Sequence, residues 1–444
     1  MLLLPVAIVA QTVAVPPSLI LPNYDRLPVG QREGIEAGAF LARTNDAGAN
    51  WYNPAGLGNS VETSLNAGAN AYEWTKMGLE GFGTSEGRSR INTVGTLLSV
   101  AIGKGTIKSD EWRLGFSLAR PVVWVPSSLD FAFSPAANQV VAYASTVDFN
   151  VMIPGVAIAY APGGVGTGRL RIGAGLGMAI TSLTQNQSIS SRVTATTSAS
   201  VAEQSFSAEG STWQLQPSAG VQWDATSRVI LGARVIAPGI RILGSTRLTL
   251  QTSQFTSPTS TDLVFRDDAA TFDYKRPLEA SAGAAYRAGS VELELDVHYY
   301  GALASYELYA SDLPGTLTTV DSSGTPTVTQ PPFTPTANSA RAVTNVAVGG
   351  NYRLSTSLRA HAGFASDVSP VDNQDESIFR KVDLSRFTTG LSLTGERLSG
   401  SLGIGYSFGS GTREAIGPTV GETRFTVKTV NVLFGLSLAF GGTK

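Results

Sequence analysis

The sequence predicts an all-β fold: a transmembrane antiparallel β-barrel of about 14 strands. Apolar and polar residues alternate with a period of two along most of the chain, which is the pattern of strands with two different faces. The segments between the alternating stretches are short and long in turn. Only 15% of the 444 residues are charged, whereas a soluble domain carries about 25%, so much of the surface is expected to face lipid.

The composition also excludes several classes of structure and function. After the first residues, no run reaches the roughly 18 apolar residues of a spanning helix. The net charge of −2 lacks the basic excess of a nucleic-acid binder, and without Cys there are no disulfides, thiol catalysis or thiolate metal sites. With two His residues and no Ser/His/Asp constellation, we expect neither an enzyme nor a metal or cofactor site.

Residues 1–22 are interpreted as an export signal and are excluded from the fold. The run Met1-Leu-Leu-Leu-Pro-Val-Ala-Ile-Val-Ala10 has the apolar length of a signal peptide, and Thr12-Val-Ala14 offers a small-residue cleavage site. The basic residues that usually precede such a run are missing, so an N-terminal strand is the alternative.

Two strands illustrate how the alternation divides the faces. In residues 291–300 one side is apolar, and the other side carries Glu292, Glu294, Asp296 and His298. In residues 397–408 the side opposite the apolar residues holds only Ser and Gly. In a barrel the apolar face meets lipid and the polar face lines the lumen. A polar face of Ser and Gly fits a crowded lumen better than open solvent.

Counting such stretches gives 14 strands, with approximate spans of 63–75, 91–103, 111–126, 149–161, 169–183, 211–223, 227–250, 276–288, 291–303, 340–353, 356–366, 386–395, 398–410 and 425–440. Short connections fall at 104–110, 162–168, 224–226, 289–290, 353–355 and 396–397. Long ones fall at 76–90, 127–148, 184–210, 251–275, 304–339, 367–385 and 411–424. Short periplasmic turns and long outer loops produce this rhythm, and an even strand count puts both termini on the periplasmic side. The long segments are rich in Ser, Thr and Pro, so we expect solvated, poorly packed loops.

Residues 23–60 do not alternate and are expected to fold differently from the strands. Their small residues favour short helices, which should end at Asn53-Pro54 because a residue before Pro avoids the helical conformation. A folded segment of this kind lies either outside the barrel in the periplasm or inside it as a plug.

Parts of this segment resemble a known family. Ala37-Gly-Ala-Phe40, Asn45-Asp-Ala47 and above all Trp51-Tyr-Asn-Pro-Ala-Gly-Leu57 are similar to the hatch of the long-chain fatty acid transporter family, which also includes carriers of toluene and related aromatic hydrocarbons. Arg359–Val371, which closes on Ser-Pro-Val, resembles the end of a late strand in that family. The resemblance extends over nearly the whole mature chain and is strong at these two places.

The resemblance implies a barrel over residues 61–444 with the hatch of residues 23–60 inside its lumen. It implies a bacterial outer-membrane protein that moves long-chain fatty acids or aromatic hydrocarbons passively, by capture near the outer loops, hatch rearrangement and lateral exit. The expected partners are the hydrophobic ligand and the outer-membrane lipids, and the chain is expected to be a monomer. An adhesin or structural barrel and a general porin are the alternatives. The chain departs from the family in its incomplete signal and in Gly441–Lys444, which follow the aromatic Phe440.

Proline marks two candidate functional positions. Asn53, Pro54 and Ala55 suit a hinge in the hatch, because Pro fixes φ and Asn bonds local backbone, while an ordinary helix stop is the alternative. Pro121 interrupts a predicted strand, because Pro cannot donate to the ladder. It marks either a kink beside a lateral opening, as the family suggests, or the point where the strand leaves the membrane.

Charged and aromatic residues supply two further candidate groups. Five charged residues are expected to face the lumen, where they either position water or a ligand head group or pair with one another: Glu292, Glu294, Asp296, Arg359 and His361. Aromatic residues of the outer loops form either an apolar capture groove or an interfacial belt: Phe131, Phe133, Phe255, Phe265 and Phe333.

Overall fold

The structure is a computed structural model that describes residues 20–60, 62–79, 83–86, 94–103, 111–136, 138–162, 169–194, 199–372, 379–415 and 422–440. Several sequence predictions therefore lie outside the described residues in whole or in part: the signal apart from residues 20–22, the start of the strand 91–103, the turns 104–110 and 162–168, and the tail 441–444. The described residues form three short helices and 21 strands.

The helices are α1 (Arg32–Ile35), α2 (Ala49–Tyr52) and the 3₁₀ helix η1 (Pro54–Asn59). The strands of the first half are β1 (Thr63–Leu79), β2 (Gly83–Glu86), β3 (Val94–Ile102), β4 (Trp112–Ala136), β5 (Gln139–Tyr160), β6 (Leu170–Thr194), β7 (Ala199–Trp223), β8 (Val229–Ile236), β9 (Ile240–Thr256) and β10 (Thr259–Phe272). Those of the second half are β11 (Glu279–Ala288), β12 (Val291–Tyr300), β13 (Leu303–Ala310), β14 (Thr316–Val320), β15 (Pro326–Thr329), β16 (Thr336–Ala340), β17 (Val343–Arg353), β18 (Leu358–Asp367), β19 (Val382–Thr394), β20 (Leu398–Ala415) and β21 (Glu422–Phe440).

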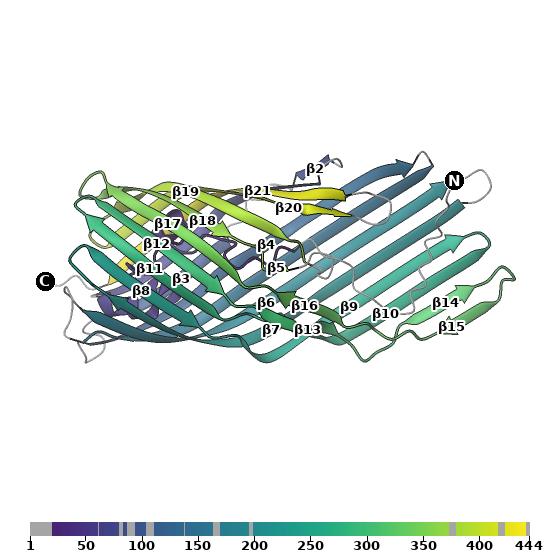
Figure 1. Cartoon of the computed structure of the whole chain (residues 1–444), viewed down its shortest axis with the longest axis horizontal. Helices are drawn as coiled ribbons and strands as arrows, with labels where there is room; N and C mark the ends of the chain where they lie inside the picture. The colour runs from purple at the N-terminus through teal and green to yellow at the C-terminus, as the bar shows by residue number, and fades with distance from the viewer. Residues whose placement is uncertain are drawn as a thin grey trace.

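The strands form one closed antiparallel barrel whose strands are tilted against its long axis (Figure 1). β21 pairs with β1 from Thr63↔Phe440 to Leu79↔Phe425, so the last strand seals the wall against the first. The predicted count of 14 wall positions is confirmed, because five positions each hold two or three strand segments in line. These in-line segments are β2 with β3, β8 with β9, β10 with β11, β12 with β13 and β14, and β15 with β16 and β17.

Proline accounts for the interruption at two of these positions. Pro238 separates β8 from β9, and Pro277 separates β10 from β11. A proline has no N–H to give to the ladder, so pairing stops and restarts around it. The continuous strand predicted for 227–250 is therefore wrong in this detail.

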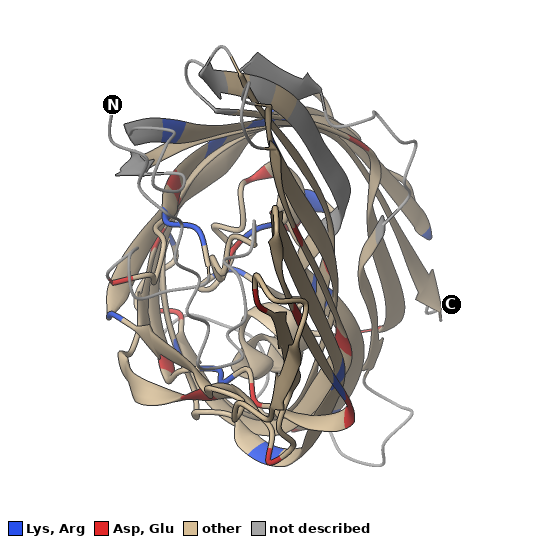
Figure 2. Ribbon diagram, turned by 90° about the vertical axis from the view of Figure 1, so that its right-hand side faces the viewer, with Lys and Arg blue, Asp and Glu red and all other residues tan. Residues whose placement is uncertain are grey.

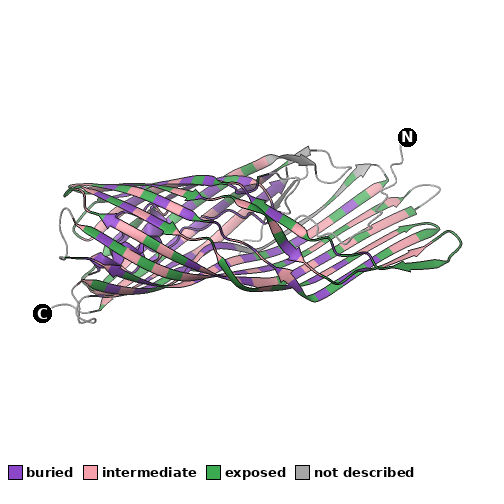
Figure 3. Cartoon of the chain, turned by 60° about the horizontal axis from the view of Figure 1, so that its bottom comes forward, coloured by how far each residue is buried: buried purple, intermediate pink, exposed green. Residues whose placement is uncertain are grey.

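The two faces of the wall divide as predicted. On β12 the outward Leu293 is 52% exposed, whereas the inward Glu294 is 2% exposed. On β20 the outward Leu402 is 60% exposed and the inward Ser401 is 5% exposed. Figure 3 follows this alternation along the strands. An outward face of large apolar side chains requires lipid around it, because contact with water is unfavourable for apolar surface.

The long connections are the main departure from the sequence prediction. β6 and β7 have 25 residues each and pair along their whole length, so most of the predicted loop 184–210 is strand. β4 with β5 and β9 with β10 extend likewise through 127–148 and much of 251–275. The physical reason is their inner face, where apolar side chains such as Phe206 and Leu250 are buried. The upper wall thus has a hydrophobic core of its own.

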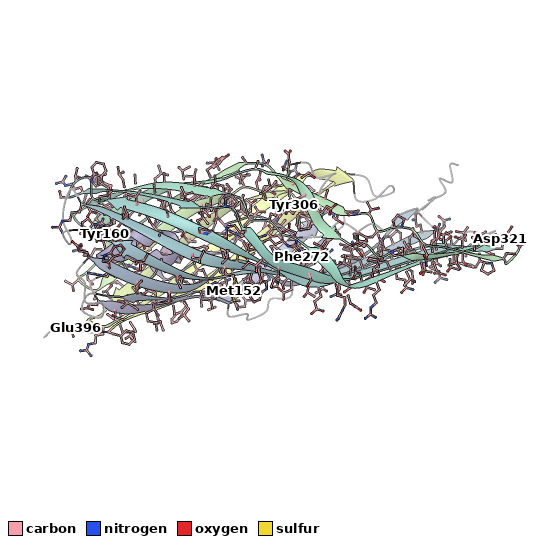
Figure 4. The ribbon with its side chains drawn as sticks, turned by 90° about the horizontal axis from the view of Figure 1, so that it is seen from below. Met152, Tyr160, Phe272, Tyr306, Asp321 and Glu396 are labelled. Carbon is pink, nitrogen blue, oxygen red and sulfur yellow. The ribbon has the colours of Figure 1, made fainter. Side chains whose placement is uncertain are left out.

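The two ends of the barrel differ in their connections. The short turns after β7, β11, β17 and β19 lie at one end, called here the periplasmic end. Figure 4 places Tyr160 and Glu396 at this end and Asp321 at the opposite, outer end. Trp112 and Tyr160 pack together with ring centroids 4.9 Å apart, as in the aromatic belt at a membrane interface.

Residues 20–60, called here the luminal segment, lie inside the wall. Helix η1 packs on β5, β6 and β7, and α1 packs on β18, β19 and β20. Viewed along the barrel, ribbon lies within the ring of strands (Figure 2). Most side chains of the segment are buried, so it fills the periplasmic half of the lumen.

Candidate functional site in the barrel lumen

Asn53 connects the luminal segment to the wall. It is extended (φ −159°, ψ 109°) and ends α2, as expected for a residue before Pro54. Its Oδ1 accepts a hydrogen bond from the backbone N of Ala55 at 3.2 Å and thereby caps η1. Its Nδ2 donates to the carbonyl oxygens of Leu41 (3.2 Å) and of Val221 on β7 (3.0 Å). The side chain is therefore an anchor, and the hinge role of Asn53–Ala55 stays a prediction.

Two wall glycines make room for this anchor. A Cβ on Gly173 of β6 would overlap the backbone of Pro54 and Ala55, and a Cβ on Gly220 of β7 would overlap the Asn53 side chain. On the neighbouring β5, by contrast, a Cβ on Gly155 would meet its nearest atom at an ordinary 3.5 Å. The Ser and Gly of the inner face predicted a crowded lumen, and contact with the luminal segment is the cause of the crowding.

Arg43 is the centre of a buried ion cluster between the segment and the wall. Its guanidinium pairs with Glu36 of the segment and, through Nε at 2.8 Å, with Glu294 of β12. Glu292 lies 3.7 Å away, and the carbonyl oxygen of Ala39 accepts a hydrogen bond from Nη2 at 3.0 Å. Burying a charge is very costly unless it is paired, so these partners are what permits Arg43 to lie inside the barrel.

The other end of Glu36 joins His361 to the cluster. His361 Nδ1 lies 2.6 Å from Glu36 Oε1, and its Nε2 lies 2.7 Å from Ser392 Oγ. Burial opposes ionisation of Glu36, but Arg43 and His361 together keep its pKa below the ordinary value. Asp296 also binds the luminal segment, because its Oδ2 accepts a hydrogen bond from the backbone N of Leu41 at 3.0 Å.

Arg359 completes the cluster at its solvent-near edge. Its Nη1 donates to Asn351 Oδ1 at 2.8 Å and lies 3.6 Å from Glu292. All five charged residues that the sequence assigned to the lumen thus face inward, and most of them bind the luminal segment rather than only one another. The sequence reasoning missed Glu36 and Arg43, although they are charged residues within an otherwise small and apolar stretch.

Glu33 is a second buried carboxyl group on the luminal segment. Burial and the nearby Asp46 raise its pKa to about 7, against the opposing effect of Arg32. Its Oε2 accepts a hydrogen bond from the backbone N of Gln31 at 2.9 Å. Glu33 is therefore partly protonated near neutral pH, unlike an exposed glutamate.

Toward the outer end the lumen becomes apolar. Buried hydrophobic side chains from β1, β4 to β7, β9, β10, β13, β19 and β21 and from the connections near them form one cluster on the inner face. Its aromatic members are Phe149, Phe206, Phe265, Phe272, Tyr274, Tyr309, Phe333, Phe379 and Phe425. Ile20 and Leu21, which the sequence assigned to the export signal, lie in the luminal segment and are buried in the same cluster. The lumen therefore has two levels, an apolar outer level and a polar periplasmic level.

The predicted outer-loop aromatics divide between the two faces of this outer level. Phe265 and Phe333 stack with ring centroids 5.0 Å apart inside the apolar cluster. Phe255 is 49% exposed and faces outward. The side chains of Phe131 and Phe133 lie outside what the structure describes.

A cavity of about 60 Å³ lies where the two levels meet. Its lining includes Tyr24, Leu27, Pro121 and Arg276. Arg276 is 7% exposed, and within the described residues its Nε has no hydrogen-bond partner and no carboxylate forms an ion pair with it. Tyr274, two residues earlier, belongs to the apolar cluster, so Arg276 is a buried cation at the boundary between the levels.

The wall is interrupted beside this cavity. Among the described residues, β3 and β4 pair no further than Leu97↔Ala119. On the other side, the pairing of β4 with β5 shifts register between Ala119 and Val122. The ladder is thus broken on both sides of Pro121, whose carbonyl oxygen instead accepts a hydrogen bond from Leu27 N at 2.9 Å. The segment replaces a strand partner here, while a lateral opening stays a prediction.

The architecture defines the class of protein: a closed 14-stranded barrel of the outer-membrane type with a filled lumen. The sequence matches no protein-family model and no curated protein. Among solved structures, the toluene transporter TodX of Pseudomonas putida is similar at 13% identity with a TM-score of 0.61, covering 95% of this chain and 100% of that chain. A Pseudomonas aeruginosa FadL homologue is similar at 15% identity with a TM-score of 0.57, covering 94% and 100%.

The monoaromatic hydrocarbon channel CymD is a third similar structure, at 13% identity with a TM-score of 0.56, covering 96% of this chain and 100% of that chain. The chain therefore has the fold of the FadL- and TodX-type channels, as the resemblance implied. Two of these similar structures are a toluene transporter and a monoaromatic hydrocarbon channel. None of the described helices has the length and apolar character to cross a membrane, and no three metal-ligating side chains are grouped among the described residues.

Proposed function

We propose that this chain is a passive channel of the bacterial outer membrane for hydrophobic small molecules, with long-chain fatty acids ahead of aromatic hydrocarbons. The two-level lumen is the observation that carries the proposal. An apolar outer level suits capture of an apolar ligand, and each CH₂ group moved there from water contributes about 0.8 kcal/mol. The similar solved structures include a toluene transporter and a monoaromatic hydrocarbon channel.

The polar level explains why the ligand leaves sideways rather than through the periplasmic end. Below the apolar cluster, an apolar tail would meet the buried charges of the Arg43 cluster and displace their partners, which is unfavourable. The break at Pro121 lies beside the cavity between the levels and offers a path into lipid that avoids both water and buried charge.

Passage requires part of the luminal segment to move. A cavity of about 60 Å³ is far smaller than the roughly 300–1,000 Å³ of a typical ligand site. The end of the segment nearest the outer level is the part that moves: an entering tail displaces Ile20 and Leu21 from the apolar cluster and releases the bond from Leu27 N to Pro121. Asn53 and Arg43 hold the rest of the segment in place as a hatch.

Arg276 favours a carboxylate-bearing ligand over a neutral hydrocarbon. Its guanidinium is buried and lines the cavity, and among the described residues its Nε has no hydrogen-bond partner. Glu279, whose charge acts on Arg276 in the same cavity, is already paired with Arg234. A fatty acid with its tail in the apolar cluster would bring its carboxylate to this cation. Toluene has no charged group that could pair with Arg276.

Uptake in bacteria that lack their own fatty-acid channel and express this chain tests the proposal. Labelled oleate and toluene are compared with a hydrophilic sugar. Entry of oleate or toluene without the sugar supports the hydrophobic channel. Entry of the sugar alone would identify a porin, and entry of nothing would favour an adhesin or structural barrel.

Arg276→Gln tests the choice between the two ligand classes. A hydrogen bond to a charged group contributes about 1.5–3 kcal/mol, so we expect oleate uptake at limiting concentration to fall roughly 10- to 100-fold. Toluene uptake should stay at the parent rate, and Arg276→Lys, which keeps the charge, should retain part of the oleate uptake. An equal loss for both ligands would assign Arg276 a structural role instead.

A further inference from the structure

We propose that Arg120, on the lipid-facing side of the break at Pro121, is a second binding site for the ligand's carboxylate and receives it as the ligand leaves the barrel. The inference rests on the proposed function and adds an exit site to it. Arg120 is separated from the cavity by the wall itself, because successive residues of a strand point to opposite faces.

Arg120 is the first charge on an otherwise apolar row. The outward residues of β4 below it are Trp112, Leu114, Phe116 and Leu118. Trp112 and Phe116 are 43% and 47% exposed, as expected for side chains that contact lipid. An arginine on the lipid face of a barrel costs about 2–4 kcal/mol at the membrane midplane and less toward the interface. An anionic partner would stabilise an arginine at the end of this row.

The height of Arg120 in the wall fits such a partner. Trp112, packed on Tyr160, lies at the periplasmic aromatic belt. Eight residues of about 3.3 Å each, on a strand tilted by about 40°, place Arg120 roughly 20 Å above it. The apolar band of a barrel is about 25 Å tall, so Arg120 lies near its outer edge. The carboxylate of a fatty acid inserted in the outer leaflet lies at this interface.

The surroundings of Arg120 leave its charge available. Its Nη2 contacts the sulfur of Met152 at 4.0 Å, and it forms no ion pair with any carboxylate among the described residues. Met152 is on β5, part-way between Tyr160 and the outer extension (Figure 4). A thioether is a weak hydrogen-bond acceptor and cannot compensate a guanidinium charge.

The neighbouring Pro121 links this exterior site to the interior one. Pro121 lines the same cavity as Arg276, and the ladder is broken on both sides of it. A carboxylate that leaves Arg276 through this break reaches Arg120 on the other side. An anion in apolar surroundings without a counter-ion is very unfavourable. With one cation on each face of the wall, the carboxylate has a counter-ion on both sides of the break.

Uptake of two ligands with the same chain tests the proposal: oleate, which is anionic, and oleyl alcohol, which is neutral. We expect Arg120→Leu to lower the oleate rate at least fivefold and to leave the oleyl alcohol rate at the parent value. Arg120→Lys should keep most of the oleate rate. Arg228→Leu, at an exposed periplasmic turn, is the matched control and should change neither. Heat-modifiable gel migration establishes that each variant assembles as a barrel.

Three results would overturn the proposal. If Arg120→Leu lowers the uptake of both ligands alike, Arg120 stabilises the barrel wall and does not bind the carboxylate. If it changes neither, the site has no role in exit, and a loss of co-purified lipopolysaccharide in that case identifies a lipid phosphate as its partner. If the parent chain takes up neither ligand, the proposed function fails and this inference fails with it.

Discussion

Arg43 is the residue on which the position of the luminal segment depends most. Its removal leaves Glu36 and Glu294 buried without their counter-charge, and breaking a buried pair in this way typically costs about 3–5 kcal/mol. Arg32 offers a contrast within the same segment. Its pair with Asp46, at 3.0 Å, is partly exposed, and such pairs contribute about 0–1 kcal/mol.

We therefore expect Arg43→Met to release the segment and Arg32→Met to leave it in place. Amide hydrogen exchange of residues 30–60, followed by mass spectrometry, measures the release directly. In Arg43→Met the exchange should accelerate about 100-fold or more, since each 1.4 kcal/mol is a factor of ten, and in Arg32→Met by less than about fivefold. Equal acceleration in the two variants would show that the buried cluster does not hold the segment.

Glu33 makes the docking of the segment depend on pH. In the docked state its pKa is raised to about 7 from the ordinary 4.5, so docking retains a proton that the released segment loses. The stabilising contribution is complete below pH 4.5 and is lost as the pH rises to about 7, a change of up to about 3 kcal/mol. Glu36, whose pKa is lowered, acts in the opposite sense and only below that window.

Exchange of residues 30–60, corrected for the chemical rate, should therefore rise by up to about tenfold per pH unit between pH 5 and 7. Glu33→Gln, which cannot ionise, should reduce this dependence. A parent chain whose corrected exchange is flat across the window, or a variant that keeps the full slope, would contradict the assignment to Glu33.

At the scale of elements, the contact between η1 and β6 is built around the missing side chain of Gly173. Overpacking a filled site typically costs about 1–3 kcal/mol, so Gly173→Ala should displace Asn53–Ala55 from the wall. We expect the lumen to leak, with increased entry of a small hydrophilic antibiotic into cells that express the variant. Gly155→Ala on β5 is the matched control and should not leak, because its new methyl group meets nothing closer than 3.5 Å. Leakage in both variants, or in neither, counts against the contact.

The strands that face lipid were predictable from the sequence, and the outer extensions were not. In β12 large apolar and charged residues alternate, so the period of two is plain. In β7 the outward residues of the extension are mostly Ser and Glu, and the inward ones include Gln204 and Ala208 beside Phe206. This composition resembles a loop, because neither face is uniformly apolar. Cross-strand pairing over the whole length of β6 and β7 supplies the stability that composition did not indicate.

Across the whole molecule, the face of the wall on which each candidate residue lies was predictable from the sequence, and the residues that it contacts were not. Alternation alone assigned Glu294 and His361 to the lumen. Their partners come from residues 251 and 325 positions away, a distance over which sequence spacing carries no information. Arg276 was missed for the same reason, because a buried guanidinium whose Nε has no hydrogen-bond partner among the described residues is recognised only once its neighbours in space are known.

The length of β6 and β7 carries part of the barrel wall beyond the membrane. Strands of 25 residues, at about 3.3 Å per residue and a tilt of about 40°, rise roughly 60 Å, of which the lipid covers about 25 Å. The rest of these strands extends beyond the outer face of the membrane on one side of the barrel, together with β4, β5, β9 and β10 (Figure 1). Under the proposed function, the buried apolar side chains on their inner face let a molecule avoid the polar outer layer of the membrane. The distance that the molecule diffuses through hydrated polysaccharide is then set by the protein.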